Sequence, residues 1–90
     1  MNRPLEKLIN IGPKVAAGLR EIGIADEAAF REIGYMEAFL RMRLISPHWN
    51  HKMLLYALYG AINESNCMHL PDEIKVRLRD ELSSFDIDKR

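Results

Sequence analysis

The sequence predicts an all-α fold, a compact bundle of about five to six short helices built on tandem helix-hairpin-helix-like units. Apolar residues recur at spacings of three and four through most of the 90 residues, which is the period of an amphipathic helix. Glycine and proline divide these segments into short lengths. Because 48% of the residues are hydrophobic, the chain can form a packed core. We expect one domain over residues 1–85 and a flexible tail over residues 86–90.

The first unit is expected over residues 5–24, as two helices joined by a tight turn. Leu5, Leu8 and Ile9 share one face of the first helix, because they stand at positions i, i+3 and i+4. Gly12 is expected to supply the backbone freedom that a sharp turn needs.

The second helix of this unit is expected to begin at Pro13, which has a fixed φ and no N–H to lose. Its apolar face comprises Val15, Ala16, Leu19 and Ile22. Gly23 is expected just after the end of the helix, with Ile24 making a hydrophobic contact beneath it.

A hairpin of this kind has a characteristic chemistry. The turn and the first residues of the second helix leave backbone N–H groups unpaired, and the helix dipole adds partial positive charge there. Such a site binds anions, and on DNA the anion is a phosphate. Lys14, in the first helical turn, would add a charge-assisted contact. The nucleic-acid-binding candidates are therefore Asn10, Ile11, Gly12, Pro13 and Lys14. The alternative is that Gly12 and Pro13 only turn the chain and Lys14 is merely solvated.

A second unit follows with a similar pattern. Asp26 is expected to cap a short helix, which Gly34 ends before a helix that runs from Tyr35 to the Ser46-Pro47 pair. Ile11-Gly12 and Ile33-Gly34 stand 22 residues apart, and an alanine follows each glycine four residues later. This spacing indicates a tandem pair of helix, Ile-Gly turn, helix.

The last third of the chain predicts two more helices. A segment from Lys52, for which Asn50 is a candidate N-cap, is apolar nearly all round and is expected to be the buried core helix. Within it, Gly60 is expected to accept close packing of a neighbouring segment. The final helix is expected to begin at Pro71 and to bury a face made of Ile74, Leu78 and Leu82.

The charges argue against a dedicated nucleic-acid binder with high affinity. Thirteen basic and thirteen acidic residues give a net charge of zero. The distribution is uneven, since residues 2–20 carry four basic residues against one acidic, or +3, and residues 21–37 carry one against five, or −4. We therefore expect a dipolar molecule whose basic end lies at the hairpin.

No catalytic constellation is visible, so we expect neither an enzyme nor a cofactor. A metal site is also not expected, because the H-x2-H and C-x-H spacings of the candidate ligands do not match common zinc sites. Those candidates are His48, His51, Cys67 and His69. Trp49 either stacks on a partner or, as we expect, covers the core. With one cysteine, no membrane-length apolar run and no signal peptide, a cytoplasmic protein is expected.

The chain resembles the C-terminal domain of the TfoX/Sxy family of bacterial competence regulators. The resemblance rests on segments that occur in the right order over about residues 5–80: LEKLINIGPKVA from Leu5 to Ala16, LREIGI from Leu19 to Ile24, EAFLR from Glu37 to Arg41, LLYALYGA from Leu54 to Ala61, and Leu70-Pro71 before the last helix.

This resemblance implies an all-helical domain of helix-hairpin-helix type. In the family the domain sits beside an N-terminal α/β domain, and the proteins regulate transcription of DNA-uptake genes together with a cyclic-AMP-dependent activator. The given sequence does not include that N-terminal domain, so we expect either a stand-alone relative or an excised domain, and the Met1 start and polar tail favour the first.

Two hypotheses about function follow. In the first, the domain is a regulatory module that makes weak, sequence-independent contacts to DNA phosphates through the Asn10–Lys14 hairpin. In the second, it is a protein-interaction module with a purely structural hairpin. Its partner would be a transcription regulator, a separate TfoX N-terminal-type domain or a second copy. An exposed apolar patch around Trp49, Tyr56 or Tyr59 would favour the second hypothesis. The sequence does not fix the oligomeric state.

Overall fold

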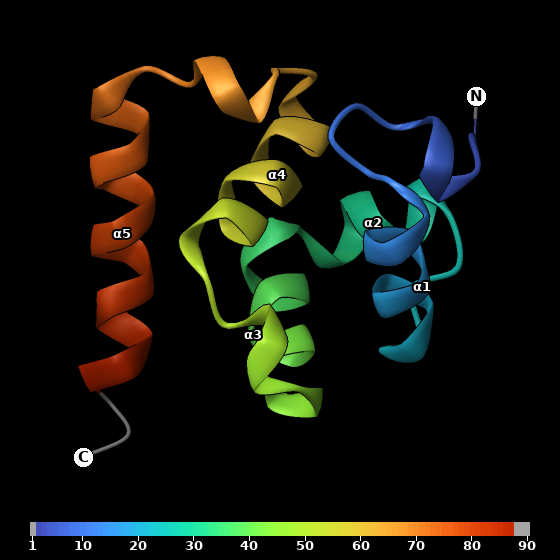
Figure 1. The fold of residues 1–90 in the computed structure, drawn as a ribbon, viewed down its shortest axis with the longest axis horizontal. Helices are drawn as coiled ribbons and strands as arrows, with labels where there is room; N and C mark the ends of the chain where they lie inside the picture. The colour runs from blue at the N-terminus through green and yellow to red at the C-terminus, as the bar shows by residue number, and fades with distance from the viewer. Residues whose placement is uncertain (1, 88–90) are drawn as a thin grey trace.

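The computed structural model describes residues 2–87, which form five α-helices and three short 3₁₀ turns without any β-strand. This confirms the predicted all-α bundle. The order is η1 (Leu5–Lys7), α1 (Pro13–Glu21), α2 (Glu27–Ile33), α3 (Tyr35–Ile45), η2 (Pro47–Trp49), α4 (Lys52–Asn63), η3 (Cys67–His69) and α5 (Asp72–Ile87). Figure 1 shows α3 and α4 at the centre, with α1 and α2 on one side and α5 on the other.

The segment before α1 differs from the predicted first helix. It forms only the single 3₁₀ turn η1, after which Leu8 is extended with a ψ of 144°. Leu5 and Leu8 are buried as expected, but Ile9 is 40% exposed. The chain then reverses at Asn10, whose φ is 71°. Three residues cannot form a stable α-helical turn, so the buried side chains, rather than helix hydrogen bonds, hold this segment in place.

The prediction that Gly12 supplies the conformational freedom of the turn is wrong. Its φ of −89° and ψ of −178° are extended values that any residue can adopt. A Cβ atom at Gly12 would meet nothing within 4 Å. Asn10 adopts the left-handed conformation instead, and asparagine is among the few other residues that tolerate it.

Helix α1 begins and ends as predicted. Pro13 opens the helix, and Gly23, with a φ of 90°, follows its end. The N–H of Gly23 donates to the carbonyl of Arg20 (3.0 Å), and the N–H of Ile24 donates to that of Leu19 (3.0 Å). These two bonds form a Schellman motif, and Ile24 is fully buried beneath it.

The two predicted units are related but not equivalent. Gly12 precedes α1 and Gly34 precedes α3, and in each case the alanine four residues later donates its N–H to the glycine carbonyl. Ala16 and Ala38 are both fully buried. The turns differ, because Gly34 has a φ of 88° and follows directly from α2. As predicted, Asp26 caps α2 by accepting from the N–H of Ala29 at 3.0 Å.

Helix α4 is the core helix that the sequence predicted. Every residue from Leu54 to Leu58 is buried, and α4 packs against α3, α5 and η3. Its N-cap is His51 rather than Asn50, since the Nδ1 atom of His51 accepts from the N–H of Leu54 at 3.1 Å. The chain turns once more at Pro47–Trp49 before α4, which places the cap one residue later than predicted.

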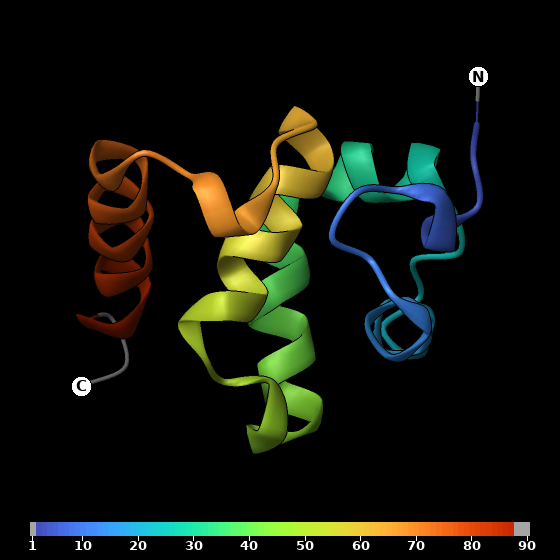
Figure 2. The ribbon, with the colours of Figure 1, turned by 45° about the horizontal axis from the view of Figure 1, so that its top comes forward.

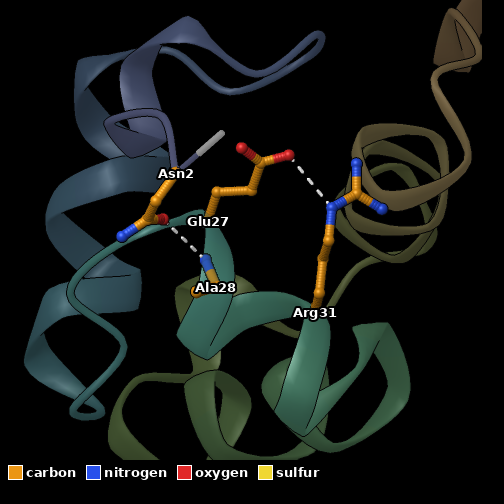
Figure 3. Close-up of a pocket in the computed structure, with 4 residues that line it drawn as sticks. All are labelled: Asn2, Glu27, Ala28 and Arg31. Carbon is orange, nitrogen blue, oxygen red and sulfur yellow. Dashed lines mark hydrogen bonds and ion pairs between the residues drawn. The ribbon is translucent and has the colours of Figure 1, made fainter.

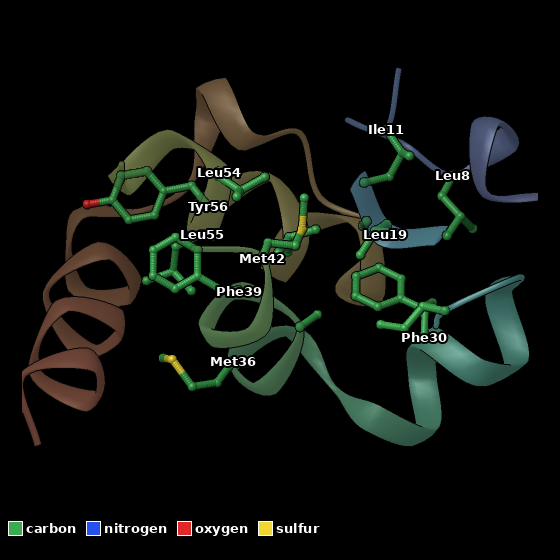
Figure 4. Close-up of a cluster of buried hydrophobic side chains, with 14 of the residues drawn as sticks. Leu8, Ile11, Leu19, Phe30, Met36, Phe39, Met42, Leu54, Leu55 and Tyr56 are labelled. Carbon is green, nitrogen blue, oxygen red and sulfur yellow. The ribbon is translucent and has the colours of Figure 1, made fainter. Parts of the chain in front are cut away.

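The core is continuous from α1 to α5. Figure 4 shows Leu19 and Phe30 on one side, Phe39 and Leu55 on the other, and Met42 between them. Trp49 packs against this core, as expected. Its ring lies over Gly18 of α1, where a Cβ atom would stand 2.9 Å from the ring and 2.7 Å from the terminal methyl of Met42.

Helix α5 lies at the edge of the bundle (Figures 1 and 2). It begins at Asp72, directly after Pro71, and its predicted inner face is confirmed: Leu78 is fully buried, with Ile74 and Leu82 partly buried. The helix extends through Ile87. Residues 88–90, the greater part of the expected tail, lie outside the described residues.

Candidate nucleic-acid interface

The start of α1 presents backbone donors without partners. Among residues 2–87, the N–H groups of Gly12, Lys14 and Val15 have no hydrogen-bond acceptor, and no side chain caps the helix. The first bond of the helix runs from the N–H of Ala16 to the carbonyl of Gly12 at 2.9 Å. The positive end of the α1 dipole coincides with these donors. The geometry is therefore that of an anion site.

Two lysines near this helix start are free to meet an anion. Lys7 and Lys14 are exposed, and neither side chain makes an ion pair or hydrogen bond with the part of the chain that the structure describes. Lys14 is the second residue of α1, which places its side chain on the same helical turn as the unpaired N–H groups.

The five predicted site residues divide into two groups. Gly12, Pro13 and Lys14 are exposed, whereas Ile11 is only 5% exposed and belongs to the core. Asn10 points inward as well. Val15 was not among the predicted site residues, although its N–H is one of the three unpaired donors. Its position, three residues after Gly12, was the available signal, because the first turn of a helix leaves its N–H groups unpaired.

The side chain of Asn10 is engaged inside the protein. Its Nδ2 atom donates to the carbonyls of Ala57 (3.3 Å) and Ser65 (2.9 Å), and its Oδ1 atom accepts from the N–H of Cys67 (3.1 Å). Both amide donors are thereby used. Asn10 thus joins the hairpin to the middle of α4, to the turn after this helix and to η3.

The basic end expected at the hairpin is partly neutralised by internal ion pairs. Arg20 forms a bidentate ion pair with Glu6, in which both N–O distances are 2.7 Å. Arg3 pairs with Glu27 at 3.0 Å and with Glu64 at 3.7 Å. Of the four cations between residues 2 and 20, only Lys7 and Lys14 remain unpaired among the described residues.

Glu27 is the buried charge in this region, with 5% exposure. It accepts bonds from the side chain and backbone N–H of Arg3 and, at 3.0 Å, from Nε of Arg31. These bonds hold the pKa of Glu27 well below its usual range. Figure 3 shows Glu27 and Arg31 lining a pocket with Asn2, whose side chain accepts from the N–H of Ala28. The ion pairs of Glu27 with Arg3 and Arg31 neutralise the charges beside this pocket. We therefore interpret it as a structural contact and not as a ligand site.

The histidines and the cysteine do not gather into a metal site. Among the described residues, no group of three or more His, Cys, Asp or Glu side chains is placed to hold a metal ion. His48 and His51 lie between α3 and α4, whereas Cys67 and His69 lie in η3.

Trp49, Tyr56 and Tyr59 do not themselves form an exposed apolar patch, since each is buried or half-buried. Tyr56 is 6% exposed, and Tyr59 packs edge-on against Tyr35 with ring centroids 5.2 Å apart. The large exposed apolar side chains of the described residues are Ile9, Leu44, Ile45, Met53, Met68, Val76 and Phe85.

These features define a class: a small all-α domain in which an exposed helix start follows a tight turn. The profile of the TfoX C-terminal domain matches residues 1–82, and the chain belongs to this family. It is a family of non-catalytic, regulatory-type domains. No curated protein matches the chain.

One solved structure supports the fold. A crystal structure of an uncharacterised protein from Listeria monocytogenes, in a triclinic form, matches with a TM-score of 0.82 and 29% sequence identity. The match covers 92% of this chain and 93% of that one. Within residues 2–87 of the present protein, no helix is long and apolar enough to cross a membrane.

Proposed function

We propose that this domain is a non-enzymatic regulatory module of the TfoX C-terminal type that works next to DNA in the cytoplasm, in the transcriptional control of DNA-uptake competence. The hairpin before α1 contacts DNA phosphates without reading sequence. The observation that best supports this proposal is that three unpaired N–H groups, at Gly12, Lys14 and Val15, lie on the same helical turn as the free ammonium group of Lys14.

The same observations bound the affinity. A turn of this size engages one or two phosphates, and the net charge of the chain is zero. Binding therefore belongs in the non-specific range, with Kd about 10⁻⁴ to 10⁻⁶ M. Each engaged phosphate contributes about −0.9 to the slope of log K against log salt, so the slope should lie near −1 to −2.

A charge-matched pair of variants tests this proposal. Lys14→Glu and Lys52→Glu change the net charge equally, and both lysines are exposed in the first turn of a helix. A glutamate in a first turn favours the helix, so both variants should fold. Binding of a short labelled DNA duplex of arbitrary sequence is measured by fluorescence anisotropy over a range of salt concentrations.

We expect Lys14→Glu to abolish binding and to remove the salt dependence, while Lys52→Glu weakens binding only slightly. If the two variants lose affinity equally, the hairpin has no special role. If the wild type fails to bind even at low salt, the phosphate-contact proposal is wrong.

The alternative, a protein-interaction module, has two observations in its favour. A groove between α3, α4 and α5 is lined by Phe39, Met53 and Leu82, and Leu44 at the end of α3 is 76% exposed. The partner would be a transcription regulator, a separate TfoX N-terminal-type domain or a second copy. For the second copy, the wild type would sediment as a dimer and Leu44→Ser as a monomer; a monomeric wild type would exclude self-association.

A further inference from the structure

The hairpin is tied to a part of the chain that is distant in sequence. The three hydrogen bonds of the Asn10 side chain reach residues 47 to 57 positions away. They connect the residue just before the Ile11-Gly12 turn to the middle of α4, to the turn after this helix and to the first residue of η3. No other predicted site residue makes a side-chain hydrogen bond to the described residues.

The backbone on both sides of this connection is unusual. Within residues 2–87, Asn10 and Glu64 are the two non-glycine residues with positive φ, at 71° and 55°. Glu64 ends α4 in the left-handed conformation, and the N–H of Ser65 donates to the carbonyl of Gly60 at 2.8 Å. This turn brings the carbonyl of Ser65 to the Asn10 amide. Two left-handed turns therefore meet here, and the Asn10 side chain of one turn bonds the Ser65 carbonyl of the other.

Gly60 provides the space for this arrangement. A Cβ atom at Gly60 would overlap the Nδ2 atom of Asn10 and the carbonyl oxygen of Ser65. The absence of a side chain at this position of α4 is thus what lets the Asn10 amide reach the helix backbone.

We propose that Asn10 is a positioning residue for the phosphate-binding hairpin and not one of its ligands. This inference rests on the proposed function. The Asn10 amide fixes the left-handed turn against α4 and η3, and so sets the direction of the free N–H groups of Gly12, Lys14 and Val15 before any phosphate arrives. Preorganised donors bind an anion more tightly than donors that must first be ordered.

The chemistry of the side chain makes the proposal specific. Aspartate has nearly the shape of asparagine, but it would place a carboxylate oxygen opposite the carbonyls of Ala57 and Ser65, where a donor is needed. Glycine keeps the positive φ and removes the amide altogether. Both substitutions should therefore impair the hairpin although both tolerate its backbone conformation.

The experiment compares Asn10→Asp and Asn10→Gly with Leu82→Ala, a truncation of a partly buried residue on α5 that lowers stability away from the hairpin. Affinity for the short labelled duplex is measured at low salt. In parallel, NMR amide signals and hydrogen-exchange rates of Gly12, Lys14 and Val15 are recorded without DNA. The second readout does not depend on DNA binding.

We expect both Asn10 variants to bind DNA about fivefold to tenfold more weakly than the wild type, the loss from weakened charge-assisted hydrogen bonds. Their hairpin amide signals should shift or broaden, while Leu82→Ala leaves both readouts unchanged. Wild-type affinity and unchanged hairpin signals in Asn10→Gly would overturn the proposal, as would equal effects from Leu82→Ala. If the wild type itself does not bind, phosphate contact is refuted and the hairpin signals alone decide whether Asn10 positions these amides.

Discussion

Replacing Gly60 by alanine has two opposing effects: it raises the helix propensity of α4, and it places a Cβ atom where the tertiary structure leaves no space. Gly60 lies inside α4, where alanine is favoured over glycine by about 1 kcal/mol. Considered as an isolated helix, Gly60→Ala should therefore stabilise the protein. In the folded domain, however, the added Cβ atom overlaps the Asn10 amide and the backbone carbonyl of Ser65, and backbone cannot move aside cheaply.

The expected magnitude follows from the bonds that would be lost. Expelling the Asn10 side chain breaks its three hydrogen bonds, at about 1 kcal/mol each. Subtracting the gain in helix preference leaves a net destabilisation of about 2 kcal/mol. For a domain of this size, that lowers the melting temperature by roughly 8–16 °C.

Thermal and urea unfolding, followed by circular dichroism, measure this change. A double-mutant cycle with Asn10→Gly identifies its cause: if the alanine acts by displacing the amide, the double variant should lose at least 1 kcal/mol less than the sum of the two single variants. A Gly60→Ala protein as stable as the wild type, or more stable, would refute the reasoning.

Three further predictions follow from other contacts. Gly12→Ser should stabilise the protein by about 0.5 kcal/mol in urea unfolding, since position 12 is an open, extended N-cap where serine is preferred; a loss of stability would show that the turn needs glycine. The Arg20 hydrogen bonds lower the pKa of Glu6 to about 2, from its ordinary 4.5. This pair therefore stabilises the fold above pH 4.5, and the contribution is lost as the pH falls toward 2. The melting temperature of Glu6→Gln should fall less over this pH range than that of the wild type, and parallel curves of melting temperature against pH would contradict the assignment. Leu78→Ala truncates the one fully buried side chain described on α5 and should lower the free energy of unfolding by about 2–3 kcal/mol. Amide hydrogen exchange should accelerate first in α5, and uniform acceleration across all helices would show that α5 does not detach separately.

Much of the candidate site was predictable because its signals are local. An unpaired helix start after Gly12-Pro13 requires only the residues in that turn. The free charge of Lys14 was equally visible. Ile11 was predicted among the phosphate-contacting residues, but its side chain is buried. The apolar character of a single turn residue does not show whether it faces the core or the surface.

The sequence by itself determined the elements whose physics is complete within a few residues. Pro13, Gly23 and Asp26 set helix ends through fixed dihedral angles and bonds that span three to five positions. The uninterrupted apolar character of α4 likewise determined that this helix is central, because no arrangement of the chain could leave all its faces in water.

Only the tertiary structure decided how distant segments use one another. Asn10 is a left-handed residue because partners about 50 positions away satisfy its amide, and no local pattern encodes that proximity. The cations Arg3 and Arg20 are engaged because Glu27 and Glu6 lie beside them after folding. Charge, hydrogen-bonding capacity and backbone tolerance are properties of single residues, but which group meets them depends on packing, and packing alone separated the positioning residue Asn10 from the exposed donors of α1.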